Sequence, residues 1–457
     1  MKSFPAALAA ISLLAFAPSS WAMNAPARVC AACVKANIER LAGDALHGRR
    51  CGSDDEHAAA ALLVAQLKQY GIKGAFDRGG FLQPVRLSSP RFASPPTLEL
   101  SSGAQALRLT LGDEMVAREL PATLDAPLTR RSAGASIGEV AGKVVIYEPA
   151  ASGPPPGAIL KAGAAAVIVP ASEVAQRRWA EMLQRAAGST DVIGGPMHEA
   201  PTGGATIVLR PAEFARLAGF DEGHAKLSAV RGEPIARLTY NVVGVIHGQS
   251  RDADRRAILL SAHYDHLGVL DGVIFHGADD DASGTAAVLE FARILGSGRK
   301  PKRTVYFGLF GCEEEGELGA EYFQAHPPEP TADFAANLEF EMIGVDDPHN
   351  PGALMLTGWE RSDLGPALKA HGALIEPDPY PEQHFFQRSD NYQLALSGVV
   401  AQTVTAWPLT PTYHSASDDL AHVDLAFMDR VIGSLVGPIQ WLVNSDFQPQ
   451  WNPGGRP

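Results

Sequence analysis

Residues 257–266 have the sequence AILLSAHYDH, a short apolar run that ends in a cluster of ionisable side chains. Apolar runs of strand length recur at 304–311, 338–343 and 399–404, and a helical pattern at 285–295 separates the first two runs. Strands that are apolar along their whole length and alternate with helices are typical of a parallel sheet buried on both faces. We therefore predict an α/β domain whose central sheet is mostly parallel and flanked by helices.

Every predicted strand exit carries histidine or carboxylate side chains, and in such sheets the functional residues gather at the carboxyl ends of the strands. The segments are HYDH (263–266), GADDDASG (277–284), CEEEG (312–316), EMIG (341–344) and YHSASDD (413–419). Taken singly, each has an ordinary explanation, such as a surface ion pair, a solvated glutamate run or a helix N-cap. Together they would crowd carboxylates at one rim, which repel one another unless they are protonated or bound to cations.

The donor types at this rim favour zinc. Two imidazoles and three carboxylates form a nitrogen and oxygen ligand set that suits Zn²⁺, whereas the histidines disfavour calcium. Five protein ligands exceed the three that one catalytic zinc ion usually has, but they suit two ions that share a carboxylate and a water molecule. The sequence therefore predicts two zinc ions per chain.

In order and spacing, these segments resemble the co-catalytic dizinc aminopeptidases, a family that includes bacterial leucyl aminopeptidases and is similar to glutamate carboxypeptidase. The matching motifs are His-x-Asp, Gly-Ala-x-Asp-x-x-Ser-Gly, Glu-Glu-x-Gly-x-x-Gly, Asn-Leu-x-x-x-Met-Ile-Gly and Tyr-His-x-x-x-Asp-Asp. The resemblance implies a zinc exopeptidase fold and a peptide substrate with a free N-terminus, from which the enzyme would remove N-terminal residues.

The resemblance also implies the metal ligands, two for each zinc ion and one shared. They are His263 and Glu341 for one ion, Glu314 and His414 for the other, and Asp280 as the bridge. Many members of the family have aspartate where Glu341 stands. Glu339 points to the same face by the strand period and is the competing ligand. We prefer Glu341, because the Met-Ile-Gly sequence that follows it sets the register.

Three further residues receive catalytic roles from the same resemblance. Glu313 would be the general base, Asp265 would orient His263, and Tyr413 would steady the tetrahedral intermediate. The alternatives are a carboxypeptidase or dipeptidase, or a glutaminyl cyclase with one zinc ion. A carboxypeptidase needs cations to hold a terminal carboxylate, for which Arg361 and Arg388 are the candidates. A catalytically inactive binding protein should lack ligands, and none is missing.

The chain is expected to divide into a leader, a catalytic domain and an inserted domain. The predicted segments are a signal peptide at 1–22, a helical part of the peptidase domain at 23–89, an insert at 90–235, the catalytic domain at 236–446 and a flexible tail at 447–457. The mainly β insert resembles a protease-associated domain, and it either covers the mouth of the site or serves packing alone. The signal predicts export to the periplasm or secretion.

The net charge limits the binding partners to be expected, and the cysteines indicate where a disulfide could form. The net charge of −13 argues against nucleic-acid binding and against a basic membrane-binding surface. The oligomeric state is not predicted. Export permits disulfides, and a bridge from Cys30 or Cys33 to Cys51 is expected, with a Cys-x-x-Cys metal or redox motif as the alternative.

Overall fold

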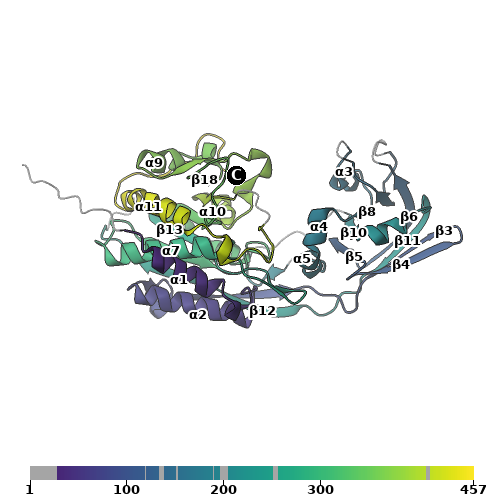
Figure 1. Cartoon of the computed structure of the whole chain (residues 1–457), viewed down its shortest axis with the longest axis horizontal. Coiled ribbons are helices and arrows are strands. Elements are labelled where there is room, and N and C mark those ends of the chain that lie inside the picture. Colours follow the sequence, from purple (N-terminus) through teal and green to yellow (C-terminus); the bar gives the residue numbers. More distant parts are fainter. Residues whose placement is uncertain are drawn as a thin grey trace, which may run out of the picture.

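The computed structural model shows two lobes, each built around one β-sheet and joined along strand β12 (Figure 1). The residues that the structure describes are 28–118, 120–132, 138–150, 153–188, 190–195, 204–250, 256–407 and 412–457. The predicted signal peptide lies outside these residues. Within them, no helix combines the length and apolar character needed to cross a bilayer.

The first lobe contains a ten-stranded sheet whose centre is parallel. The four central strands, in spatial order, are β20 (Val400–Thr405), β17 (Phe334–Glu341), β13 (Ala257–His263) and β16 (Val305–Phe310). The flanking strands are β18 (Leu354–Leu356) and β19 (Ile375–Pro377) on one side, and β12 (Ile235–Ile246), β2 (Leu82–Ser89), β9 (Asp191–Val192) and β1 (Lys73–Gly74) on the other. The predicted α/β fold with a parallel centre is confirmed, and antiparallel pairs lie only toward the edges.

Helices cover both faces of this sheet. Strand β13 shows why: Ile258 and Leu260 pack into one core and Leu259 into another, because successive side chains point to opposite faces. The helices that pack into the first core are α1 (Ala31–Leu41), α2 (Asp54–Gln69), α7 (Ala282–Ser297), α9 (Leu364–Ala370) and α11 (Leu425–Leu442). The helices on the second face are α8 (Leu318–Ala325) and α10 (Asn391–Ser397).

The second lobe is formed by an eight-stranded sheet with its own core. Its strands, in spatial order, are β4 (Gln105–Thr110), β3 (Thr97–Ser102), β11 (Glu222–Ser228), β6 (Thr123–Arg131), β7 (Val144–Tyr147), β8 (Ala166–Pro170), β10 (Ala205–Leu209) and β5 (Met115–Arg118). Its helices are α3 (Pro156–Lys161), α4 (Glu173–Arg177), α5 (Trp179–Gln184) and α6 (Pro211–Ala215). Strands β14 (Gly268–Leu270) and β15 (Val273–Phe275) form a separate hairpin beside the first sheet.

Two sequence expectations about the ends and the cysteines are corrected. Cys30 bonds to Cys33 and Cys51 bonds to Cys312, so the expected bridge from the first pair to Cys51 is wrong. Cys30 lies at the N-cap of α1 and Cys33 lies three residues later, so the bridge between them spans the first turn of the helix. The tail expected to be flexible is packed in the structure, because Trp451 Nε1 donates a hydrogen bond to the carbonyl oxygen of Gly398.

Candidate metal centre

The chemistry-bearing side chains lie together at the carboxyl edge of the parallel strands. His263 is the last residue of β13, and Glu341 is the last residue of β17. Glu313 and Glu314 follow β16, and Asp280 lies in the loop that leads into α7. The strand predicted at 338–343 ends at Glu341, so the following Met-Ile-Gly segment already turns away from the sheet.

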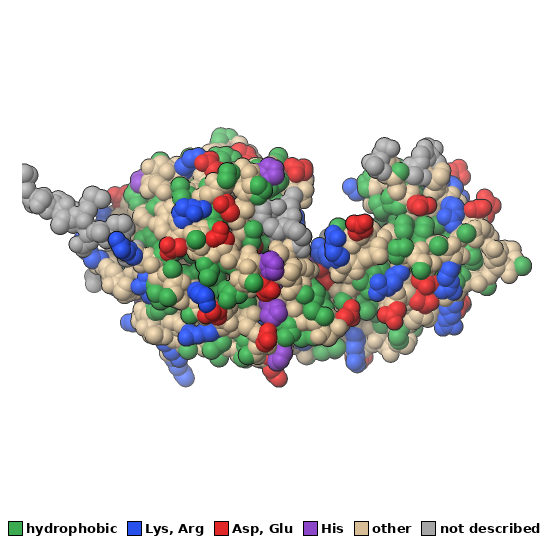
Figure 2. All heavy atoms as spheres, viewed as in Figure 1, with side chains coloured by type: hydrophobic (Ala, Val, Ile, Leu, Met, Phe, Trp, Pro, Cys, Tyr) green, Lys and Arg blue, Asp and Glu red, His purple; other side chains and the backbone are tan. Residues whose placement is uncertain are grey.

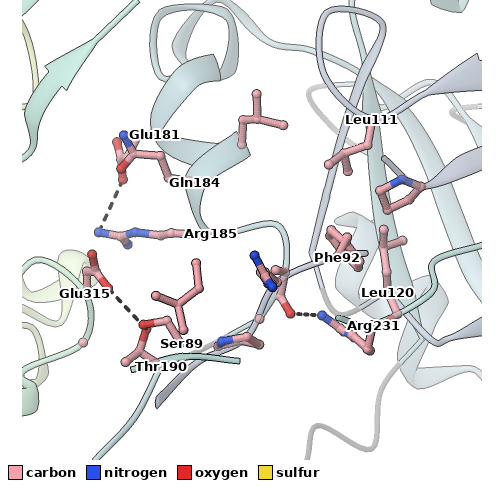
Figure 3. A pocket seen from close by; sticks show the side chains of 18 of the residues that line it. Ser89, Phe92, Leu111, Leu120, Glu181, Gln184, Arg185, Thr190, Arg231 and Glu315 are labelled. Atoms are coloured by element: carbon pink, nitrogen blue, oxygen red, sulfur yellow. Dashed lines mark hydrogen bonds and ion pairs between the residues drawn. The ribbon is translucent and has the colours of Figure 1, made fainter. Parts of the chain in front are cut away.

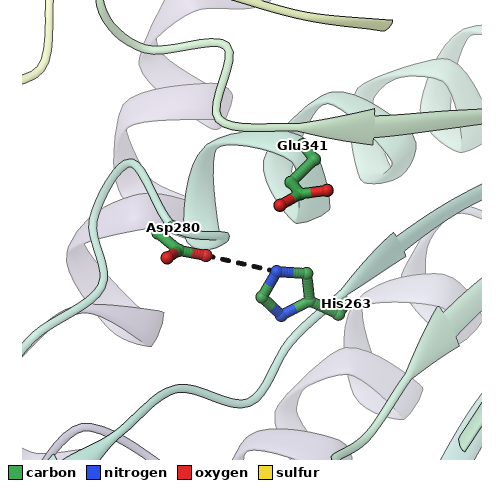
Figure 4. A group of neighbouring side chains, drawn as sticks. All are labelled: His263, Asp280 and Glu341. Carbon is green, nitrogen blue, oxygen red and sulfur yellow. Dashed lines mark ion pairs between the residues drawn. The ribbon is translucent and has the colours of Figure 1, made fainter. Parts of the chain in front are cut away.

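One group of donor atoms comes from His263, Asp280 and Glu341 (Figure 4). All three side chains are buried, and their donor atoms lie within 4.8 Å of one another. His263 Nε2 is 3.2 Å from Asp280 Oδ1. This separation and the convergence of the three side chains leave a position between them that a cation can fill.

A second group contains His266, Asp280 and Glu314, again within 4.8 Å. His414 joins it: its Nε2 atom is 3.1 Å from Glu314 Oε2 and 3.3 Å from Asp280 Oδ2. Asp280 thus directs one carboxylate oxygen toward His263 and the other toward His414, and it is the residue that the two groups share.

Each group contains buried donor atoms without a hydrogen-bond partner, as expected of metal ligands. Neither ring nitrogen of His263 has a hydrogen-bond partner, and the same holds for Glu314 Oε1. His266 Nδ1 lies 2.7 Å from Glu314 Oε1, but the contact does not have hydrogen-bond geometry. Buried polar atoms are seldom left unpaired, and this nitrogen and oxygen set fits zinc.

The electrostatics of the two groups also favour a bound cation. Burial opposes ionisation of Asp280, but the imidazoles of His263 and His414 hold its pKa below the usual range. Burial also raises the pKa of Glu341 to about 8, and the charges of neighbouring carboxylates add to this effect. A bound cation would relieve this repulsion and favour the ionised form of both carboxylates.

The loop that carries Asp280 is fixed by backbone hydrogen bonds to neighbouring carboxylates. Asp418 accepts from the backbone N–H groups of Asp279 and Asp280 at 2.7 and 3.1 Å. Gly277 adopts a φ of +60°, and a Cβ added there would lie 2.5 Å from His266 Cγ. A side chain at position 277 would therefore push the metal-site loop and His266 apart.

Fully buried Arg49 holds the same loops from the N-terminal segment. Its guanidinium donates to the carbonyl oxygens of Tyr264 and Gly277, each at 2.6 Å. One side chain thus connects the strand exit that bears His263 with the loop that bears Asp280.

Glu313 belongs to neither donor group. Its backbone N–H donates to Asp265 Oδ1 at 2.9 Å, and its Oε2 atom lies 3.9 Å from His263 Nε2. Burial raises the pKa of Glu313 well above its usual value, although the charge of His263 opposes the shift. Its side chain is 13% exposed, more than any of the predicted ligands beside it, so it borders the open side of the centre. Asp265 Oδ1 also lies 3.7 Å from His263 Nδ1.

Tyr413 and Glu339 occupy different positions relative to this centre. The Tyr413 ring stacks on His414 with the ring centroids 3.9 Å apart. Glu339 lies behind the centre, where its Oε2 atom accepts a 2.6 Å hydrogen bond from the backbone N–H of Asn391. Glu341, rather than Glu339, is therefore the carboxylate of β17 that the structure brings together with His263 and Asp280.

The second lobe also contributes side chains to the centre. Glu181 of α5 places its Oε2 atom 3.2 Å from His414 Nδ1. Arg185 donates to the carbonyl oxygen of Glu314. Figure 2 shows a deep notch between the two lobes. A cavity of about 1730 Å³ is lined by residues of both lobes, with His266 and Glu314 in its wall. Figure 3 shows part of its lining, which is polar near Glu181 and Arg185 and apolar near Phe92 and Leu120.

Sequence reasoning did not assign a role to His266 or Glu181. His266 carries a signal that could have been used, because it follows Asp265 in the same loop after β13. Glu181 carries none, because it lies in a short helix more than two hundred residues before His414 and belongs to the other lobe. Its place follows only from the packing of the two lobes.

Comparison with known structures defines the class of fold. The structure superimposes on an aminopeptidase from Aneurinibacillus sp. strain AM-1 with a TM-score of 0.61, over 93% of this chain and 97% of that one, at 19% sequence identity. The chain therefore shares the fold of this aminopeptidase, which agrees with the exopeptidase fold predicted from the sequence motifs.

Sequence comparison finds similarity to zinc peptidases. Residues 241–436 match the model of peptidase family M28. A probable zinc metalloprotease from Leptosphaeria maculans is 31% identical over 144 residues, which are 29% of this chain and 32% of that protein. Leucine aminopeptidase 1 from Ajellomyces capsulatus is 33% identical over 113 residues, 23% of this chain and 28% of its own. The chain thus spans about a third or less of the length of these two relatives.

Proposed function

We propose that the protein is a metallo-aminopeptidase that uses two zinc ions to remove N-terminal residues from peptides. The observation that carries the proposal is Asp280, which is shared by two buried groups of donor atoms at the carboxyl edge of the sheet. The family match of residues 241–436 and the aminopeptidase fold support the same reaction class.

The proposed ligands are those that the sequence motifs assign, so His414 rather than His266 is placed beside Glu314. They are His263 and Glu341 for one ion, Glu314 and His414 for the other, and Asp280 between them. When bound, zinc would supply Lewis-acid chemistry and lower the pKa of a coordinated water molecule to about 7. The notch between the lobes is the side from which a peptide would approach.

Glu313 is proposed as the general base, because its carboxylate lies outside both donor groups and borders the open side. In this role its carboxylate takes a proton from the attacking water and passes it to the leaving amine. Asp265 accepts a hydrogen bond from the backbone of Glu313 and faces His263, so it holds the base and one ligand in position relative to each other. Tyr413 steadies the tetrahedral intermediate beside His414.

A free amino terminus is proposed as the feature that selects substrates, which makes the enzyme an exopeptidase. Leucine aminopeptidase 1, one of the relatives, bears this activity in its name. We also propose that residues 1–22 direct export and that the insert at 90–235 forms a separate domain. Its sheet borders the cavity beside the metal centre and would limit access to small peptides.

The test combines zinc analysis with hydrolysis of a panel of aminoacyl-anilides, each compared with its N-acetylated form. We expect two zinc ions per chain and cleavage of the free-amine substrates alone. One zinc ion per chain would favour a glutaminyl cyclase. Equal cleavage of the blocked substrates would contradict an aminopeptidase and favour another peptidase on the same scaffold.

A further inference from the structure

Helix α5 of the second lobe brings a buried carboxylate to the metal centre of the first lobe. The side chain of Glu181 is only 6% exposed, and its Oε2 atom lies 3.2 Å from His414 Nδ1 in hydrogen-bond geometry. The opposite ring nitrogen, Nε2, faces Glu314 and Asp280. The imidazole is therefore held between a carboxylate of one lobe and two carboxylates of the other.

We propose that Glu181 is a positioning residue that fixes the tautomer and orientation of His414; this inference rests on the proposed role of His414 as a zinc ligand. A neutral imidazole carries one N–H. When Nδ1–H donates to Glu181, Nε2 keeps its lone pair and points it between Asp280 and Glu314. A carboxylate behind a metal-bound histidine fixes the ring and makes it a stronger ligand.

Arg178 holds the Glu181 carboxylate in place. Its Nε and Nη2 atoms donate to the two carboxylate oxygens at 2.7 and 2.6 Å, a bidentate pairing. Arg178 Nη2 also lies 3.1 Å from His414 Nδ1. A hydrogen bond there would place the ring proton on Nε2, so a metal ion at Nε2 requires that Nδ1 donate to Glu181 instead.

The two imidazoles at the centre are backed by carboxylates in the same way but from different parts of the chain. Asp265, two residues after His263, faces the Nδ1 atom of that ring at 3.7 Å. Glu181 takes the equivalent position behind His414 at 3.2 Å. The carboxylate behind the histidine of one zinc site therefore comes from the second lobe, whereas the carboxylate behind the histidine of the other site comes from the first lobe.

The experiment measures zinc affinity in the full-length protein by competition with a chromophoric chelator, together with the visible spectrum of the Co²⁺-substituted protein. Glu181→Ala should lower the zinc affinity of the site that contains His414 about 10- to 100-fold and leave the affinity of the other site unchanged. It should also change the Co²⁺ spectrum. Glu181→Gln, which keeps an acceptor but loses the charge, should have an intermediate affinity. Glu173→Gln, at an exposed position of neighbouring α4, is the matched control.

The outcomes separate this inference from the proposed function. A wild-type protein that does not bind two zinc ions would overturn the proposed function, and this inference with it. Two zinc ions in the wild type, but unchanged affinity and spectrum in Glu181→Ala, would overturn the positioning role alone. Equal weakening of both ions would also overturn it, because a general disturbance of the fold would then explain the loss.

Discussion

The two lobes contain the same structural unit and use it differently. In the first lobe β13 and β16 are parallel and fully buried, and in the second lobe so are β7 and most of β8. In the first lobe, β13 ends at buried His263. The corresponding strand of the second lobe is followed by Glu148, which is exposed, and β8 is followed shortly by exposed Glu173.

This difference shows that the parallel sheet provides an edge on which chemistry can be placed but does not itself specify it. Burial is what distinguishes the two edges: at the first, carboxylates are removed from water and forced against imidazoles, whereas at the second they stay solvated. Function belongs to the site rather than to the fold. Substitutions at matched positions of the two lobes test this view.

The largest effect is expected from Asp280→Ala. Because this carboxylate is shared by both donor groups, its loss should reduce bound zinc from two ions per chain toward none and abolish peptidase activity. Atomic absorption of the purified protein measures the metal content. Asp113→Ala, at an exposed position of the second lobe, should keep two zinc ions. Retention of both ions in Asp280→Ala would refute the bridging role.

Glu313→Gln should lower kcat by about 10²- to 10⁴-fold, the usual contribution of a general base, while both zinc ions remain bound. The matched substitution is Glu148→Gln at the exit of β7, which should leave kcat unchanged. Steady-state kinetics and zinc analysis on the same preparations decide the matter. Full activity in Glu313→Gln would mean that another group takes the proton.

The separate cores predict separate stability effects. Leu260→Ala in the first core and Ile168→Ala in the second each remove a fully buried side chain, at a cost of about 2–5 kcal/mol. Calorimetry should show that each substitution lowers the unfolding temperature of its own lobe. If both substitutions shift one common transition equally, the lobes unfold as a single unit.

A smaller, pH-dependent effect is expected at Glu317. Burial raises the pKa of this carboxyl to about 8, and the charges of Glu339 and Glu321 contribute. The folded state then binds the proton more tightly than the unfolded state, so stability falls as the pH rises from about 4.3 toward 8.

Glu317→Gln should therefore be more stable than the wild type at pH 8, by on the order of 1–2 kcal/mol given its partial exposure, and should lose this advantage at pH 5. Urea unfolding of the zinc-free proteins at the two pH values measures the difference. Exposed Glu173→Gln in the second lobe should show no such change. A pH-independent difference at Glu317 would mean that its carboxyl ionises normally in the folded state.

The sequence predicted the parts of the centre that lie next to strand ends, because a buried apolar run marks its own exit. The positions of His263, Glu314 and Glu341 follow from that rule, and their roles stay predictions. Glu181 could not be predicted, because its position depends on how two lobes pack. The bridge between Cys51 and Cys312 was missed for the same reason, since 261 residues separate its ends and only the fold brings them together.

The way in which the chain leaves and re-enters the first sheet has a consequence for modularity. Ser89 at the end of β2 is paired with Ile235 at the start of β12, so the second lobe begins and ends at neighbouring points of one antiparallel ladder. A short turn between these residues would close the ladder as an ordinary hairpin. The second lobe is thus topologically removable: a direct turn from Ser89 to Ile235 would take from the first sheet only the short edge strand β9 and leave the order of its other strands unchanged.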